Sequence, residues 1–161
     1  PSITGGGQEL GRRGGSENVS GIVGFGLAAE LSAGELARAG ELADKRDRME
    51  ADLRAAMPDV RIFGAQAPRL PNTSCFGLAG LHGETVVMAL DLAGISVSAG
   101  AACSSGKVSR SHVLDAMGIE HDVSSGAIRV SLGRDTDDGA CDRLVENWLK
   151  QAAKLQRAAA Q

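Results

Sequence analysis

The chain has 161 residues, of which 43% are hydrophobic and 23% charged, a composition typical of one globular domain. Its net charge of -3 and its aromatic content of 2% argue against a nucleic-acid partner, because such partners attract basic surfaces and aromatic stacking platforms. No apolar run approaches the roughly 18 residues of a membrane-spanning helix, and no signal peptide is present, so we expect no membrane partner.

The first eighteen residues are rich in glycine, which argues against a regular helix there. A helical pattern then begins at Val19 and continues to about Met57, with a possible break near Gly34 and either Asn18 or Ser20 as its N-cap. Its apolar residues fall roughly on one stripe, which is typical of a helix packed on a core. The members of this stripe are Leu27, Leu31, Leu36, Leu42, Met49 and Leu53.

Shorter segments follow this helix. Alternating or apolar runs predict four strands, and capped periodic runs predict three more helices. The strands are expected at 59–64, 71–78, 95–100 and 127–133. The helices are expected at 83–94, at 111–118 with Ser111 as its N-cap, and at 136–156. Hairpin-like and crossover connections both occur in this order, which predicts an α/β two-layer sandwich with a small mixed or antiparallel sheet.

The three cysteines are widely spaced and form no CxxC pair, so we expect neither a metal site nor a disulfide framework. An odd number of cysteines fits a reducing compartment, and we expect a cytoplasmic protein. Cys75 lies in a strand pattern and Cys141 in a helix, so packing explains both. Cys103 differs because small residues surround it in a glycine-flanked loop that makes its thiol accessible. We therefore predict a functional role for Cys103.

Arg129 is the second candidate residue, because it lies on the polar face of the strand at 127–133. A planar guanidinium binds a carboxylate through two parallel hydrogen bonds, although a plain surface charge would also explain the residue. The three histidines are far apart in the sequence, and surface or capping roles suffice for them. A nucleophilic pair between His112 and Cys103 is an alternative that the sequence leaves open.

Four motifs occur in the order and at the spacing of one known family: "GGGQELGRRGGSEN", "SVSAGAACSSG", "SHVLDAMG" and "AIRVSLGR". Together they resemble the C-terminal part of group I cysteine desulfurases, which are pyridoxal-phosphate-dependent enzymes of the class V aminotransferases. The resemblance implies that residues 1–18 belong to the end of the large, cofactor-binding domain. Residues 19–161 would then form the small domain of a fold-type I enzyme, with the catalytic cysteine loop at about 99–111.

The resemblance also implies roles for individual residues. Cys103 matches the cysteine that attacks the sulfur of L-cysteine and carries it away as a persulfide, and Arg129 matches the arginine that holds the substrate carboxylate. Ser16 stands where the family usually has threonine, and its hydroxyl would bind the cofactor phosphate of the partner subunit in a homodimer. Arg13 and Gly15 match the rest of that phosphate-binding motif.

The family's Schiff-base lysine lies in a Ser-x-His-Lys stretch, and no such stretch occurs in these 161 residues. The chain also begins "PSITGGG" without an initiator methionine. We therefore expect a fragment of a cysteine desulfurase that is inactive alone and that, with its large domain, passes sulfur to an acceptor such as an iron–sulfur scaffold protein. The alternative is a stand-alone sulfur carrier that holds a persulfide on Cys103 without pyridoxal phosphate.

Overall fold

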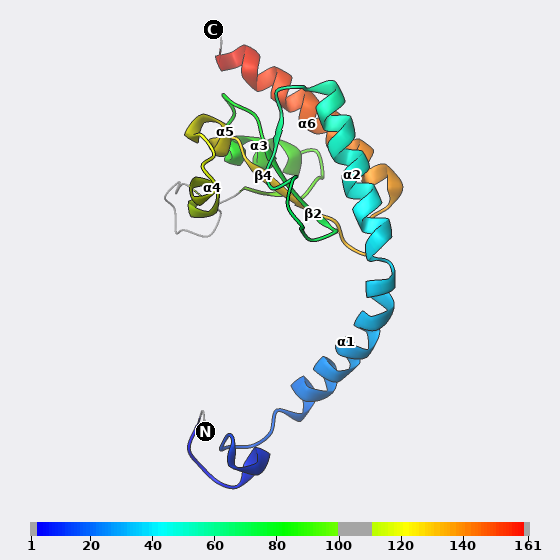
Figure 1. Cartoon of the computed structure of the whole chain (residues 1–161), viewed down its shortest axis with the longest axis vertical. Coiled ribbons are helices and arrows are strands. Elements are labelled where there is room, and N and C mark those ends of the chain that lie inside the picture. Colours follow the sequence, from blue (N-terminus) through cyan, green and yellow to red (C-terminus); the bar gives the residue numbers. More distant parts are fainter. Residues whose placement is uncertain (1–2, 100–110, 160–161) are drawn as a thin grey trace. The chain divides into compact units, whose positions relative to one another are not determined.

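The computed structural model describes residues 3–99 and 111–159 (Figure 1). These residues form two compact units, which meet in the sequence between Arg38 and Ala39. The assignment of residues 1–18 to a large domain stays a prediction, because the structure contains no such domain against which to test it.

The first unit contains a short 3-10 turn, η1 (Gln8–Gly11), and helix α1 (Val19–Ala37). The segment before α1 folds back on itself, since the amide of Gly14 donates to the carbonyl of Ile3 over 2.9 Å. Asn18 is the N-cap of α1, and its side chain accepts a hydrogen bond of 3.1 Å from the amide of Gly21. Of the two expected caps, Asn18 is therefore the one the structure uses.

The helical pattern expected from Val19 to about Met57 is divided into two helices, so the possible break is real but lies four residues after Gly34. Helix α1 ends at Ala37, and helix α2 (Ala39–Ala56) begins two residues later, so the break lies at Arg38 and not at Gly34. The apolar stripe that was expected to pack on a core is also divided between the two helices. Leu27, Leu31 and Leu36 are exposed on α1, whereas Met49 and Leu53 of α2 are fully buried.

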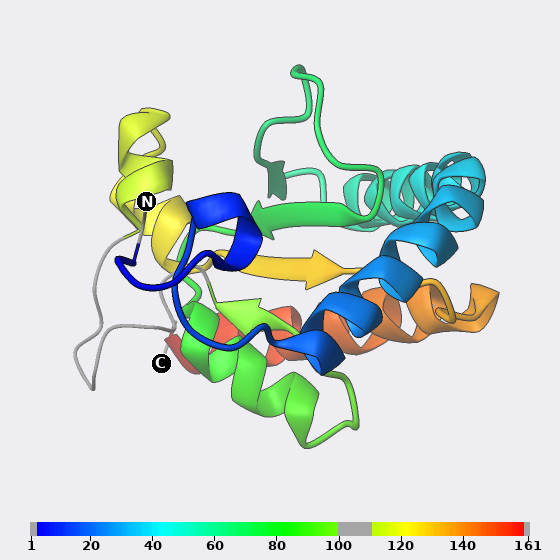
Figure 2. The same cartoon turned by 90° about the horizontal axis from the view of Figure 1, so that it is seen from below.

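The second unit is a four-stranded sheet with helices. Its strand order is β1-β2-β4-β3, and all neighbouring strands are antiparallel, as Figure 2 shows. This architecture confirms the predicted α/β fold and selects the antiparallel form of the sheet. Besides α2, the elements are β1 (Arg61–Ile62), β2 (Thr73–Gly77), α3 (Gly83–Asp91), β3 (Ser98–Ala99), α4 (His112–Ala116), α5 (His121–Ser125), β4 (Ile128–Ser131) and α6 (Asp138–Ala159).

The main core lies between one face of the sheet and helices α2, α3 and α6. Helices α2 and α6 pack side by side (Figure 1). Phe76 of β2 and Trp148 of α6 meet edge to face with ring centroids 5.4 Å apart, a favourable geometry for aromatic pairs. Cys141 is buried in the same core, as expected for a packing thiol.

Strand β4 alternates as predicted and so separates the two faces of the sheet. Ile128 and Val130 are buried in the core, while Arg129 and Ser131 are exposed on the other face. The helix at 121–125 was not expected from the sequence. It lies against the end of β2, where Gly77 has no side chain: a Cβ there would come within 2.6 Å of the carbonyl oxygen of Val123.

Helix α1 also corrects the expectation that no segment suits a membrane. With 19 residues and a mean hydropathy of 1.2, it is long and apolar enough to cross one. Helices of the same length and hydropathy also pack inside soluble proteins, so these two properties assign no location. What the structure does show is that none of its residues is buried.

Candidate functional site

The open face of the sheet carries a cavity of about 430 Å³ whose floor includes Arg129. Three elements enclose it: the sheet, the segment between β1 and β2, and helix α4. Ser111 caps α4 by accepting a hydrogen bond of 3.4 Å from the amide of Leu114, as the sequence predicts. The other lining residues are largely apolar and include Phe63, Pro68, Leu70, Val113, Leu114 and Met117.

Arg129 is the cationic centre of this pocket. Its cross-strand neighbours are Cys75 on β2 and Ser98 on β3, so the three side chains share one face of the sheet. Within the described ranges the guanidinium makes no hydrogen bond or ion pair. Such a guanidinium, beside the apolar side chains of the pocket, is suited to bind a small carboxylate, because its parallel N–H groups match the two carboxylate oxygens.

Cys75 packs against a second, small apolar cluster of Phe63, Leu114 and Ala127, as the sequence reasoning expected, and it also lines the pocket. It is half-buried and lines the Arg129 cavity, while its neighbours Ser74 and Phe76 point into the core. Burial raises the pKa of the Cys75 thiol to about 11, although the charge of Arg129 acts in the opposite direction. The thiol is therefore protonated at neutral pH and is a poor nucleophile. The alternation along β2 contained the signal that this side chain faces away from the core.

The predicted phosphate motif lies in the first unit, just before α1. Nη1 of Arg13 donates to the carbonyl oxygens of Gly15 (3.1 Å) and Ser16 (2.7 Å), so this guanidinium holds the shape of its own loop. Gly15 has a φ of 89°, a conformation that favours glycine. Ser16 is exposed two residues before the Asn18 cap, and its hydroxyl has no hydrogen-bond partner among the described residues. A free hydroxyl beside a helix N-terminus fits a phosphate oxygen.

Cys103 lies outside the described residues, so the structure does not test its role or its pairing with His112. His112 and the two other histidines are exposed. In the described part of the chain no cluster of potential ligands suits a metal ion. Two of the lysines there are paired with acidic groups: Lys45 lies 3.0 Å from Asp138, and Lys150 lies 2.7 Å from Glu146.

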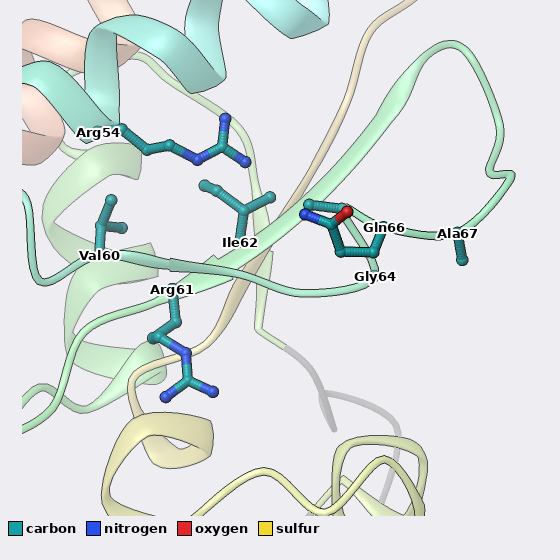
Figure 3. Close-up of a pocket in the computed structure, with 8 residues that line it drawn as sticks. Arg54, Val60, Arg61, Ile62, Gly64, Gln66 and Ala67 are labelled. Atoms are coloured by element: carbon teal, nitrogen blue, oxygen red, sulfur yellow. The ribbon is translucent and has the colours of Figure 1, made fainter.

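A second hollow, of about 440 Å³, lies beside the edge strand β1 (Figure 3). Arg54 and Ile62 lie on one side of the strand, and Arg61 extends on the other side. Both arginines have acidic neighbours at 3.6 Å, Glu50 for Arg54 and Glu120 for Arg61. Their charges are thus partly neutralised, unlike the charge of Arg129.

Comparison with known proteins identifies the family of this chain. The family model described as aminotransferase class-V matches residues 3–144. The chain belongs to the class-V aminotransferase family. The family resemblance read from the four sequence motifs is thereby confirmed, and the match covers both units of the structure.

Individual proteins are also similar to this chain in sequence or in structure. A cysteine desulfurase of Cereibacter sphaeroides is 47% identical over 91% of this chain, and one of Trichormus azollae is 44% identical over 91%. Among solved structures, a NifS-like protein superimposes with a TM-score of 0.79 at 32% identity over 96% of this chain. A NifS-like protein from Rickettsia africae gives a TM-score of 0.80 at 29% identity over 95%.

This class-V aminotransferase chain spans only part of these proteins. It covers 37% of each of the two desulfurases and 39–40% of the two solved structures.

Proposed function

We propose that this chain is part of a cysteine desulfurase that converts L-cysteine to L-alanine and retains the sulfur as a persulfide on Cys103. The observation that carries the proposal is the guanidinium of Arg129, which lines a largely apolar pocket and has no hydrogen-bond or ion-pair partner among the described residues. The similarity to proteins named cysteine desulfurase supports it.

Arg129 would bind the carboxylate of L-cysteine. Two parallel N–H donors match the two carboxylate oxygens, which fixes the orientation of the substrate as well as its position. The thiol of Cys75 lines the pocket beside Arg129, and Ser98 is the neighbour of Arg129 on the other adjacent strand. Because Cys75 stays protonated at neutral pH, it does not compete with Cys103 for the substrate sulfur.

Cys103 would act as the nucleophile. Its thiolate attacks the sulfur of the substrate, an S–S bond forms, and the carbon–sulfur bond breaks. Pyridoxal phosphate, when bound, supplies the electron sink that this cleavage needs. Ser16 would contribute its free hydroxyl to the cofactor phosphate, while Arg13 and Gly15 would keep the loop in its observed conformation.

The remaining partners follow from this chemistry. The Schiff-base lysine would come from the part of the family that this chain does not span, and the phosphate contact of Ser16 would reach a partner subunit in a homodimer. The persulfide would pass to a sulfur acceptor such as an iron–sulfur scaffold protein in the cytoplasm. The competing hypothesis is a sulfur carrier that works without pyridoxal phosphate.

The test is a chimera that joins the N-terminal part of the Cereibacter sphaeroides desulfurase to this chain. With pyridoxal phosphate and L-cysteine, we expect the chimera to release alanine and the isolated chain to release none. Arg129→Gln should lower kcat/KM about 100-fold, the effect of losing two hydrogen bonds between charged groups. Arg134→Gln is the matched control, since Arg134 is exposed and pairs with Asp135 outside the pocket.

Cys103→Ala tests the nucleophile, and alanine release by the chimera separates the two hypotheses. In the desulfurase it should abolish both the persulfide and sustained alanine release. If the chimera releases no alanine while the isolated chain accepts sulfur onto Cys103 from a persulfide donor, the sulfur carrier is the correct reading.

A further inference from the structure

A buried carboxylate lies beneath the wall of the Arg129 pocket. Glu50, on helix α2, is only 2% exposed. Arg69 donates to both of its oxygens, over 2.6 Å to Oε1 and 2.8 Å to Oε2, and the hydroxyl of Ser74 donates to Oε1 over 2.7 Å. A carboxylate with this low exposure and three short hydrogen bonds has a fixed position.

Both partners of Glu50 belong to the pocket wall or border it. Arg69 lines the cavity and lies in the segment 63–72 that connects β1 to β2. Ser74 lies on β2 between Thr73 and Cys75, which both line the cavity. Glu50 therefore joins helix α2 to two sides of the same pocket, although it does not line the pocket itself.

Two further contacts hold the same segment. Nη1 of Arg46, also on α2, donates to the carbonyl oxygen of Leu70 over 2.6 Å. The side chain of Asn72 donates to the carbonyl oxygen of Leu132 over 3.0 Å, and the Leu132 amide returns a bond of 2.8 Å to Asn72. The segment is thus anchored at Arg69, Leu70 and Asn72, and Glu50 is the more deeply buried of the two charged anchors, 2% exposed against 8% for Arg46.

We infer that Glu50 is a positioning residue for the Arg129 pocket: its carboxylate holds Arg69 and Ser74, and so keeps the 63–72 wall and strand β2 in place around Arg129. The inference rests on the proposed function for its catalytic meaning, because the pocket is where the substrate carboxylate would bind. A buried ion pair often contributes little net stability to a fold. Its use here would be to fix one arrangement of the groups around it.

The ionisation state of Glu50 agrees with this role. Burial alone would raise the pKa of its carboxyl, but the hydrogen bonds from Arg69 and Ser74 and the charges of Arg69 and Arg54 lower it on balance. The pKa of Arg69 is raised in turn, chiefly by its hydrogen bonds to Glu50. Both groups are therefore charged at neutral pH.

Cys75 provides a readout that does not depend on catalysis, because its thiol faces the pocket. In this chain with Cys103→Ser and Cys141→Ser, we would measure the rate at which methyl methanethiosulfonate modifies Cys75 at pH 8. Glu50→Gln should raise this rate about tenfold, the change that corresponds to a loss of roughly 1.4 kcal/mol in local stability. Ser74→Ala, which keeps the ion pair, should give a smaller increase.

The matched control is Arg54→Gln. Arg54 is the second cation near Glu50, at 3.6 Å, but it does not line the Arg129 pocket. It should change the modification rate less than twofold. The fluorescence of Trp148, which is fully buried in the core, checks that each variant is folded.

Equal acceleration in Glu50→Gln and Arg54→Gln would overturn the inference, and so would an unchanged rate in both Glu50→Gln and Ser74→Ala. If Glu50→Gln fails to fold, Ser74→Ala decides alone: no acceleration overturns the inference. In the chimera, Glu50→Gln should raise KM for L-cysteine more than it lowers kcat. If Arg129→Gln leaves alanine release by the chimera unchanged, the proposed function is wrong. The modification rates of Cys75 would still test the positioning role of Glu50.

Discussion

Helices α1 and α2 follow one another and are nearly equal in length, with 19 and 18 residues. Helix α1 is the more apolar of the two, yet it buries no residue. Helix α2 is rich in charged residues, yet it buries Arg46, Met49, Glu50 and Leu53. Apolar content alone therefore does not decide which helix builds a core.

The spacing of the side chains explains the difference. The four buried residues of α2 are spaced i, i+3, i+4 and i+7, so they form one stripe that packs against the rest of the second unit. The large apolar residues of α1 include Ile22, Val23, Phe25 and Leu27, which point around the helix rather than to one side. Apolar side chains therefore cover much of the circumference of α1 instead of forming one narrow stripe.

The largest expected effect is therefore a contrast between two leucines. Leu53→Ala should lower the free energy of unfolding by about 2–5 kcal/mol, because it leaves a cavity in a packed core. Leu31→Ala, on α1, should change it by less than about 0.5 kcal/mol, since its side chain is 56% exposed. Urea unfolding followed by Trp148 fluorescence measures both values. A large cost for Leu31→Ala would mean that another surface covers α1 in solution.

The next effect concerns the polar half of the α2 stripe. Glu50→Gln should cost about 2 kcal/mol of unfolding free energy, because the charged hydrogen bonds from Arg69 weaken while the side-chain volume is kept. The same urea experiment measures it. Arg54→Gln serves as the control and should cost much less, since Arg54 is half-exposed and more distant. Equal costs would show that the general charge around Glu50 matters more than the bond to Arg69.

A dependence on pH should follow from the same carboxylate. The pKa of Glu50 is lowered on folding, so its contribution to stability is fully present above the unfolded pKa, near 4.5. That contribution is lost as the pH falls through the folded pKa, which lies below that value. Unfolding free energies measured between pH 7 and pH 3 should therefore decline at the acid end. In Glu50→Gln the decline should be shallower, and an identical decline would assign it to other groups.

The sequence predicted the parts of the fold that depend on local patterns. The alternation of Ile128, Arg129 and Val130 identified the buried and open faces of β4, and the cap at Ser111 identified the start of α4. The break at Arg38 was expected four residues too early, near Gly34, because helix-favouring residues flank Arg38 directly and glycine is the stronger local signal. Nor could the sequence pair Glu50 with Arg69, since these residues lie 19 positions apart on different elements.

The smallest effect should come from an exposed ion pair that Arg48 of α2 makes. Comparing this pair with the buried pair of Glu50 tests how much burial adds to the stability contribution of an ion pair. Nη2 of Arg48 lies 3.0 Å from Asp142 on α6, a spacing close to that of the Glu50 pair, but both side chains are at least half exposed. Water and salt screen such a pair, so Arg48→Gln should cost less than about 0.5 kcal/mol. The cost should shrink further in 0.5 M salt, whereas that of Glu50→Gln should not. If the two variants respond to salt alike, burial is not what separates the two pairs.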